Sequence, residues 1–239
     1  MTPHRSERGF ALVLALTAIM FITALGVGLM LTTSSETIIA GFFVTSEASR
    51  YAAEAALERV LADLSVAPDW NGLVDGSIRS TFVDGAPGGV RTLSDGSTID
   101  LGQLLNMANC QKATGCSIAE MNRATADRPW GGNNPRWQLV AHAPLDALSN
   151  ATMSSPFYAV VLVGDDPSET DNDPTRDGSD QDNPGSGIVA IRAEAFGPRG
   201  AFRAIEVTVA RPAGVGQSGD YNDRARQIGV RILSWREVR

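Results

Sequence analysis

The sequence predicts an α+β fold, in which a long transmembrane-plus-amphipathic N-terminal helix packs on a C-terminal antiparallel β-sheet domain. Three observations lead to this prediction. Residues 10–31 contain no charged side chain, residues 36–64 repeat apolar side chains at three-to-four spacing without a proline, and residues 136–239 alternate short apolar segments with turn residues. The chain of 239 residues is long enough for one or two domains.

The N-terminal apolar segment, residues 10–31, has Thr17 and Thr23 as its only polar side chains. A helix of this length extends about 33 Å at about 1.5 Å per residue, which is enough to cross a bilayer core. Three basic residues precede it: His4, Arg5 and Arg8. The positive-inside rule therefore predicts a single-pass anchor with a cytoplasmic N-terminus and the rest of the chain outside.

The helix is expected to continue beyond the membrane to about Leu64, because residues 46–59 are rich in strong helix formers and Pro68 then ends the pattern. The predicted helix thus covers residues 10–64. Its first half suits lipid, and its second half offers one apolar face to a folded domain.

The start of the chain resembles a known export signal. Arg8-Gly9-Phe10 followed by an apolar run is similar to the class III signal of type IV prepilins, and residues 51–58 (YAAEAALE) resemble the N-terminal region of PilX-type pilus assembly proteins. The resemblance covers about the first 65 residues. It implies that residues 1–9 form a leader, that prepilin peptidase cuts after Gly9, and that the new N-terminus, Phe10, is methylated.

Leu14 departs from the pattern of most pilins, which have a glutamate at this fifth position of the mature chain. In the family, that carboxylate neutralises the N-terminal ammonium of the preceding subunit, and a carboxylate inside a membrane is costly without such a partner. PilX-like minor pilins also lack it. The resemblance therefore implies a minor pilin at the tip or in initiation of a type IV pilus.

The same resemblance implies the partners and the location. The expected partners are other minor pilins, the major pilin, a tip adhesin and prepilin peptidase. The expected location is the bacterial inner membrane, followed by the pilus in the periplasm and at the cell surface. The alternative is a membrane-anchored extracytoplasmic module that binds its target in a calcium-dependent way and never enters a filament.

Residues 65–135 form a Gly- and Asp-rich region that is expected to be irregular, with turn pairs at Asn71-Gly72, Asp75-Gly76, Asp84-Gly85 and Asp95-Gly96. It contains both cysteines of the chain, Cys110 and Cys116. Outside the cytoplasm such a pair is expected to form a disulfide. A zinc pair is the rival interpretation, although the chain offers only two histidines as nitrogen ligands.

Residues 136–239 are expected to form the antiparallel β domain. The candidate strands are Trp137–His142, Phe157–Val163, Gly187–Phe196, Phe202–Ala210 and Gln227–Trp235. Residues 197–200 (GPRG) join the third and fourth of these as a hairpin. Ile205, Val207 and Val209 alternate with polar residues, which predicts one buried and one solvated face.

An acidic loop, residues 165–183, interrupts this domain with eight of the 27 acidic residues of a chain whose formal net charge is −7. Five aspartates in it are candidate Ca²⁺ ligands: Asp171, Asp173, Asp177, Asp180 and Asp182. Ca²⁺ prefers six to eight oxygen ligands, and residues 173–178 partly match the first half of an EF-hand loop. Pro184 replaces the bidentate glutamate of such a loop, so a solvated acidic loop without an ion remains the alternative.

No catalytic motif emerges, and we expect no enzymatic activity. Residues 214–219 (GVGQSG) match a dinucleotide-binding glycine pattern, but the 20 residues that follow are too few for the rest of that site. His142 has no matched nucleophile and is interpreted as structural. An acidic chain repels phosphate, so nucleic acid is not an expected partner, and Ca²⁺ is the one cofactor considered.

Overall fold

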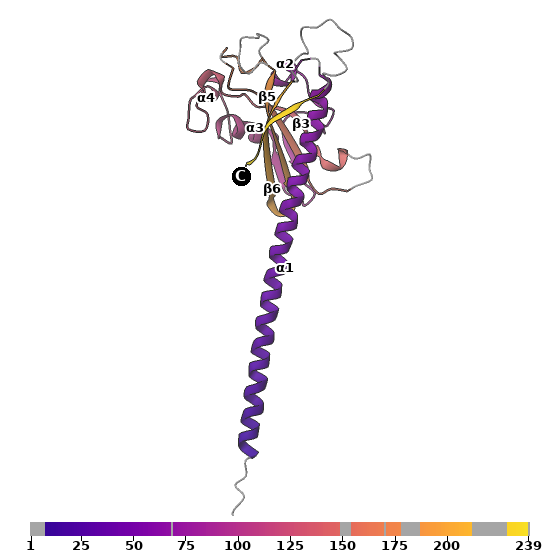
Figure 1. Cartoon of the computed structure of the whole chain (residues 1–239), viewed down its shortest axis with the longest axis vertical. Coiled ribbons are helices and arrows are strands. Elements are labelled where there is room, and N and C mark those ends of the chain that lie inside the picture. The colour runs from indigo at the N-terminus through magenta and orange to yellow at the C-terminus, as the bar shows by residue number, and fades with distance from the viewer. Residues whose placement is uncertain are drawn as a thin grey trace, which may run out of the picture. The chain divides into compact units, whose positions relative to one another are not determined.

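A computed structural model describes residues 8–67, 69–148, 154–169, 171–177, 187–211 and 229–238. The chain divides into two compact units, Met1–Thr45 and Ser46–Arg239. One long helix, α1 (Arg8–Val66), runs through the first unit and into the second (Figure 1). It begins two residues before the predicted start and ends two residues after the predicted end.

Residues 10–31 of α1, in the first unit, contain no charged side chain. This helix contains one segment that is long and apolar enough to cross a membrane, and none of that segment is buried. The hydroxyls of Thr17 and Thr23 donate to carbonyls three and four residues earlier, at 2.8 to 3.0 Å. The helix therefore satisfies the hydroxyls of these two threonines without water.

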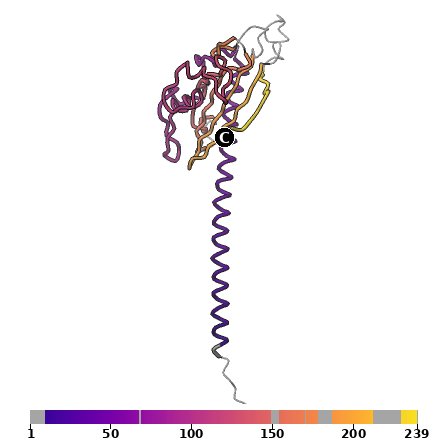
Figure 2. Tube along the Cα trace, turned by 90° about the vertical axis from the view of Figure 1, so that its left-hand side faces the viewer, coloured from indigo at the N-terminus to yellow at the C-terminus, as the bar shows by residue number. Residues whose placement is uncertain are grey.

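The second unit contains a five-stranded antiparallel sheet. Its strands are β3 (Gln138–Pro144), β4 (Tyr158–Asp165), β5 (Ile188–Gly197), β6 (Ala201–Ala210) and β7 (Arg231–Val238), and each pairs with the next one along the chain. The helix and the sheet together confirm the prediction of an α+β fold. Figure 2 shows β7, in yellow, at the edge of the sheet.

The predicted hairpin is formed by β5 and β6, whose register runs from Ile188 opposite Ala210 to Gly197 opposite Ala201. A Cβ built on Gly197 would lie only 2.3 Å from Cε1 of Phe157, so a side chain at this corner has no room. In β6, Ile205 and the next two alternate residues are buried, as the alternation predicts.

The last strand differs from its prediction. It was expected over residues 227–235, whereas β7 covers Arg231–Val238 and pairs with β6 through a register shift between Thr208 and Val209. Three large apolar side chains of β7 are exposed: Ile232, Leu233 and Trp235.

One face of the sheet packs against the last turns of α1, within the second unit. The apolar residues of α1 in this core are Ala52, Ala53, Ala56, Leu57, Val60, Leu61 and Leu64. Three of them are alanines, so much of this face of the helix is made of small side chains. The partners on the sheet include Val161 of β4, Ile191 of β5 and Val207 of β6.

The opposite face of the sheet is also covered, by the region that was expected to be irregular. Here β1 (Val90–Thr92) and β2 (Thr98–Asp100) form a small hairpin that leads into α3 (Leu101–Cys110). Short helical turns complete the region: α2 (Asn71–Val74), α4 (Ile118–Met121) and the 3₁₀ turn Gly131–Asn133.

Polar contacts hold both ends of α3. The Asp100 carboxylate caps its first turn, accepting from the N–H groups of Gly102 and Gln103 at 2.8 and 3.1 Å. Asn109 exchanges two hydrogen bonds with the backbone of Trp137, at 2.8 and 3.0 Å. Because both faces are covered, every residue of β4 is buried.

Candidate functional site

The residues of the predicted processing site lie at the start of α1. Gly9 is helical, Phe10 follows it, and Leu14 lies one turn further along with 54% of its surface exposed. Residues 1–7, which contain most of the predicted leader, are outside the described residues. Leu14 presents an exposed apolar side chain on this turn of α1.

The structure does not bring the described members of the predicted calcium site, Asp171, Asp173 and Asp177, together in one cluster. Asp180 and Asp182 lie outside the described residues. Asp171 is exposed and accepts from the N–H of Asp173 at 2.9 Å, and Asp173 in turn accepts from the hydroxyl of Thr175 at 2.5 Å. Both carboxylates therefore serve local turns.

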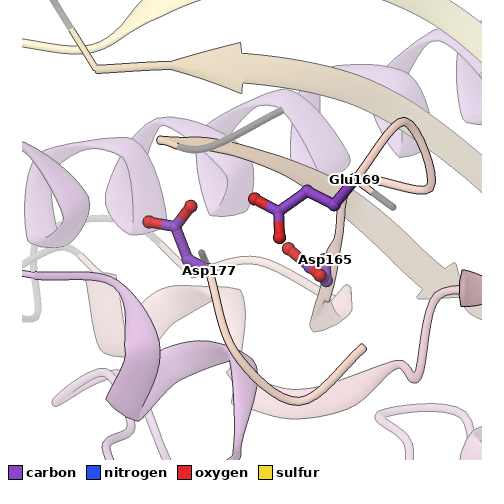
Figure 3. A group of neighbouring side chains, drawn as sticks. All are labelled: Asp165, Glu169 and Asp177. Atoms are coloured by element: carbon purple, nitrogen blue, oxygen red, sulfur yellow. The ribbon is translucent and has the colours of Figure 1, made fainter. Parts of the chain in front are cut away.

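The structure brings three carboxylates together, those of Asp165, Glu169 and Asp177. Of the predicted ligands that the structure describes, only Asp177 belongs to this group. One carboxylate oxygen from each of the three residues lies within 4.8 Å of the others. Figure 3 shows the carboxyl groups of Asp165 and Glu169 close together, with Asp177 approaching from the facing segment. The exposed fractions of the three residues are 3%, 1% and 7%. We call these residues the acidic cluster.

The fold positions each member of the acidic cluster from a different point of the connection between β4 and β5. Asp165 is the last residue of β4 and is paired with Val189 of β5. Glu169 follows in a turn, where its N–H donates to the carbonyl of Asp166 at 3.2 Å. Asp177 accepts from the N–H of Gly187 at 2.6 Å, which fastens it to the start of β5.

Burial and mutual repulsion disfavour the charged form of these groups. Loss of water and the nearby charge of Glu169 raise the pKa of Asp165 to about 8. Burial also raises the pKa of Asp177, while the N–H of Gly187 and the guanidinium of Arg211 oppose that shift. Nη2 of Arg211 lies 4.0 Å from Oδ2 of Asp177. Burial is thus the main factor that disfavours the charged form of both Asp165 and Asp177.

Carboxylate oxygens at this spacing are typical ligands of hard divalent cations. Reasoning from the sequence missed two of the three residues, because it followed the density of aspartates in residues 171–182. Asp165 carried a usable signal, since it is a charged residue that directly continues the apolar run of a predicted strand. Glu169 carried none.

The cysteines form a disulfide between Cys110, the last residue of α3, and Cys116, with a Cα–Cα distance of 5.8 Å. This is the pairing that the sequence favoured over a zinc site. Gln111, in the left-handed conformation at φ 55°, turns the chain after α3.

Comparisons of the chain with family models, with curated proteins and with solved structures found no match.

Proposed function

We propose that the chain is a minor pilin of the PilX type, which takes part in type IV pilus assembly at the tip or in initiation. The observation that carries the proposal is α1 itself. One helix contributes an exposed, uncharged apolar segment and also the Ala-rich face that packs on an antiparallel sheet. A helix built this way suits a subunit that is stored in a membrane and then transferred into a bundle of like helices.

The chemistry of the apolar segment supports both environments. In lipid, every backbone and side-chain polar group needs a partner within the helix. The hydroxyls of Thr32, Thr33 and Ser35 donate to carbonyls four residues earlier at 3.0 Å, as those of Thr17 and Thr23 do. Neighbouring helices can therefore replace lipid around this segment without leaving these hydroxyls unpaired.

Leu14 supports a position at the tip or in initiation. A subunit without a carboxylate at this position cannot neutralise the N-terminal ammonium of a subunit ahead of it. It is tolerated best where no subunit lies ahead. The partners that follow from this proposal are the other minor pilins, the major pilin and a tip adhesin.

The mass of the N-terminus of the protein isolated from host membranes tests the proposal. A chain that starts at Phe10 and carries one methyl group is the expected result. Gly9→Val should block this processing and abolish incorporation into filaments. Gly26→Val is the matched control, because a Cβ at Gly26 meets none of the described atoms within 4 Å.

The acidic cluster favours a second candidate, the membrane-anchored extracytoplasmic module that binds in a calcium-dependent way. The two candidates differ at Gly9. If the isolated protein begins at Met1 and Gly9→Val changes nothing, the pilin proposal is refuted and the anchored module remains.

A further inference from the structure

We propose that Asp165, Glu169 and Asp177 bind a Ca²⁺ ion, which joins the end of β4 to the start of β5. The three residues come from separate points of one connection, and the structure brings their carboxylates within 4.8 Å of one another in a buried place. The inference concerns the second unit alone and does not rest on the proposed function.

The oxygens, which lie within 4.8 Å of one another, are close enough to share one divalent cation. Ca²⁺ binds oxygen at about 2.3–2.6 Å in flexible geometry, whereas Mg²⁺ binds at about 2.0–2.1 Å and requires nearly octahedral geometry. An irregular set of carboxylates from a strand end, a turn and a loop matches the more permissive ion.

A second observation comes from Asp165, which is 3% exposed. Its Oδ1 atom is inaccessible to solvent and accepts no hydrogen bond from any group in the described part of the chain. Figure 3 shows this carboxyl group next to that of Glu169. Buried polar atoms are almost always paired, so an acceptor beside a further carboxylate calls for a proton or a cation as its partner.

The charges around the site are compatible with a divalent cation. The guanidinium of Arg211 stacks on the ring of Trp70 at 4.7 Å and lies 4.0 Å from Asp177. Asp69 adds a further negative charge that acts on Asp177. Backbone carbonyls and water are the usual donors for the remaining positions around Ca²⁺.

Binding would act on the connection between β4 and β5. Asp165 belongs to β4, and Asp177 is already held to the start of β5 by the N–H of Gly187, whose carbonyl accepts from the backbone N–H of Arg211 at 2.8 Å. An ion between these two points closes the base of the connection.

Thermal unfolding of the full chain in detergent micelles tests this inference, with EDTA, Ca²⁺ or Mg²⁺ present. We expect Ca²⁺ at about 100 times its Kd to raise the Tm of the wild type by about 5–10 °C. Asp165→Asn and Glu169→Gln should each abolish the rise. The control Asp171→Asn/Asp173→Asn removes two charges from the same loop, keeps the local turns and should retain the rise.

The behaviour in EDTA separates a binding site from a purely structural role. Asp165→Asn keeps the shape of the side chain and removes only its ability to carry a charge, so its Tm in EDTA should equal or exceed that of the wild type. A lower Tm would overturn the inference. It would equally be overturned by a wild type that does not respond to Ca²⁺, by a response that persists in Asp165→Asn, or by a response lost only in the control. An equal response to Mg²⁺ would refute the assignment to calcium.

Discussion

Oδ1 of Asp84 lies 2.9 Å from Nδ1 of His142, a side chain of β3 that is completely buried. The same carboxylate accepts from the hydroxyl of Tyr158 on β4 at 2.9 Å and from Nε of Arg91 at 3.0 Å. The N–H of Asp84 also donates to the carbonyl of His142 at 3.0 Å. One aspartate in a predicted turn pair thus holds the segment before β1 against the sheet.

The first prediction concerns the pH dependence of this contact. Burial lowers the pKa of His142 below its ordinary value of 6.5, with Arg91 and Arg79 acting in the same direction and Asp84 opposing them. Below pH 6.5 the imidazole of His142 therefore binds a proton in the unfolded chain but not in the folded chain, so the free energy of unfolding decreases as the pH falls.

We expect the free energy of unfolding of the wild type, minus that of His142→Gln, to be constant above pH 6.5. Below that pH the difference should fall by at most about 1.4 kcal/mol per pH unit until the folded pKa is reached. Urea unfolding at a series of pH values measures it. A difference that grows on acidification would mean that Asp84 raises the pKa of His142 instead.

The second prediction concerns the packing of α1. Ala56 is completely buried against the sheet, whereas its neighbour Ala55 is exposed. Ala56→Leu should destabilise the second unit by about 1–3 kcal/mol, because a well-packed core has no space for three extra carbons. Ala55→Leu is the control and should change stability by less than about 0.5 kcal/mol. Equal effects of the two variants would contradict the observed helix face.

The third prediction concerns the disulfide. Closing the short loop between Cys110 and Cys116 should contribute about 2 kcal/mol, because few conformations of the unfolded chain are removed. Asn109 and Asp100 hold α3 independently. Cys110→Ser/Cys116→Ser should therefore remain folded with a lower denaturation midpoint, and a reductant should lower the midpoint of the wild type but not of this variant.

The fourth prediction concerns Leu14 and depends on the proposed function. In Leu14→Glu the new carboxylate can pair with the ammonium of a subunit ahead, so labelled subunits should appear along filaments as well as at their ends. Immunogold labelling measures the distribution. Leu14→Ala is the control for loss of the leucine side chain and should stay at the ends. A wild-type protein spread along the shaft would refute the tip position.

The sequence was sufficient for the parts of the fold with a clear periodicity. Uncharged residues and a steady three-to-four spacing predicted α1 to within two residues at each end, and apolar segments on both sides of residues 197–200 predicted the hairpin of β5 and β6. The region that contains α3 was expected to be irregular, because residues 65–135 are rich in Gly and Asp. Its order depends on contacts with Trp137, 28 residues away, which no local pattern reveals.

The acidic cluster could be predicted only in part for a similar reason. Local composition pointed to Asp171 and Asp173, which serve turns within their own segment. Asp165 and Asp177 meet because β4 and β5 pair in a particular register. The sequence indicated that carboxylates of this loop could form a cation site, whereas the particular residues that come together depend on tertiary structure.

The order of the strands has a consequence for how the chain acquires its structure. Each strand of the sheet pairs with the strand that follows it, without a crossover. The pairings can therefore form one after another between strands that are adjacent in the chain, and such local topologies fold faster than those with distant pairings. The last turns of α1 precede all five strands in the chain, so their apolar face is made first and lacks its partner until the strands follow, which makes it the surface most exposed to misassembly during synthesis.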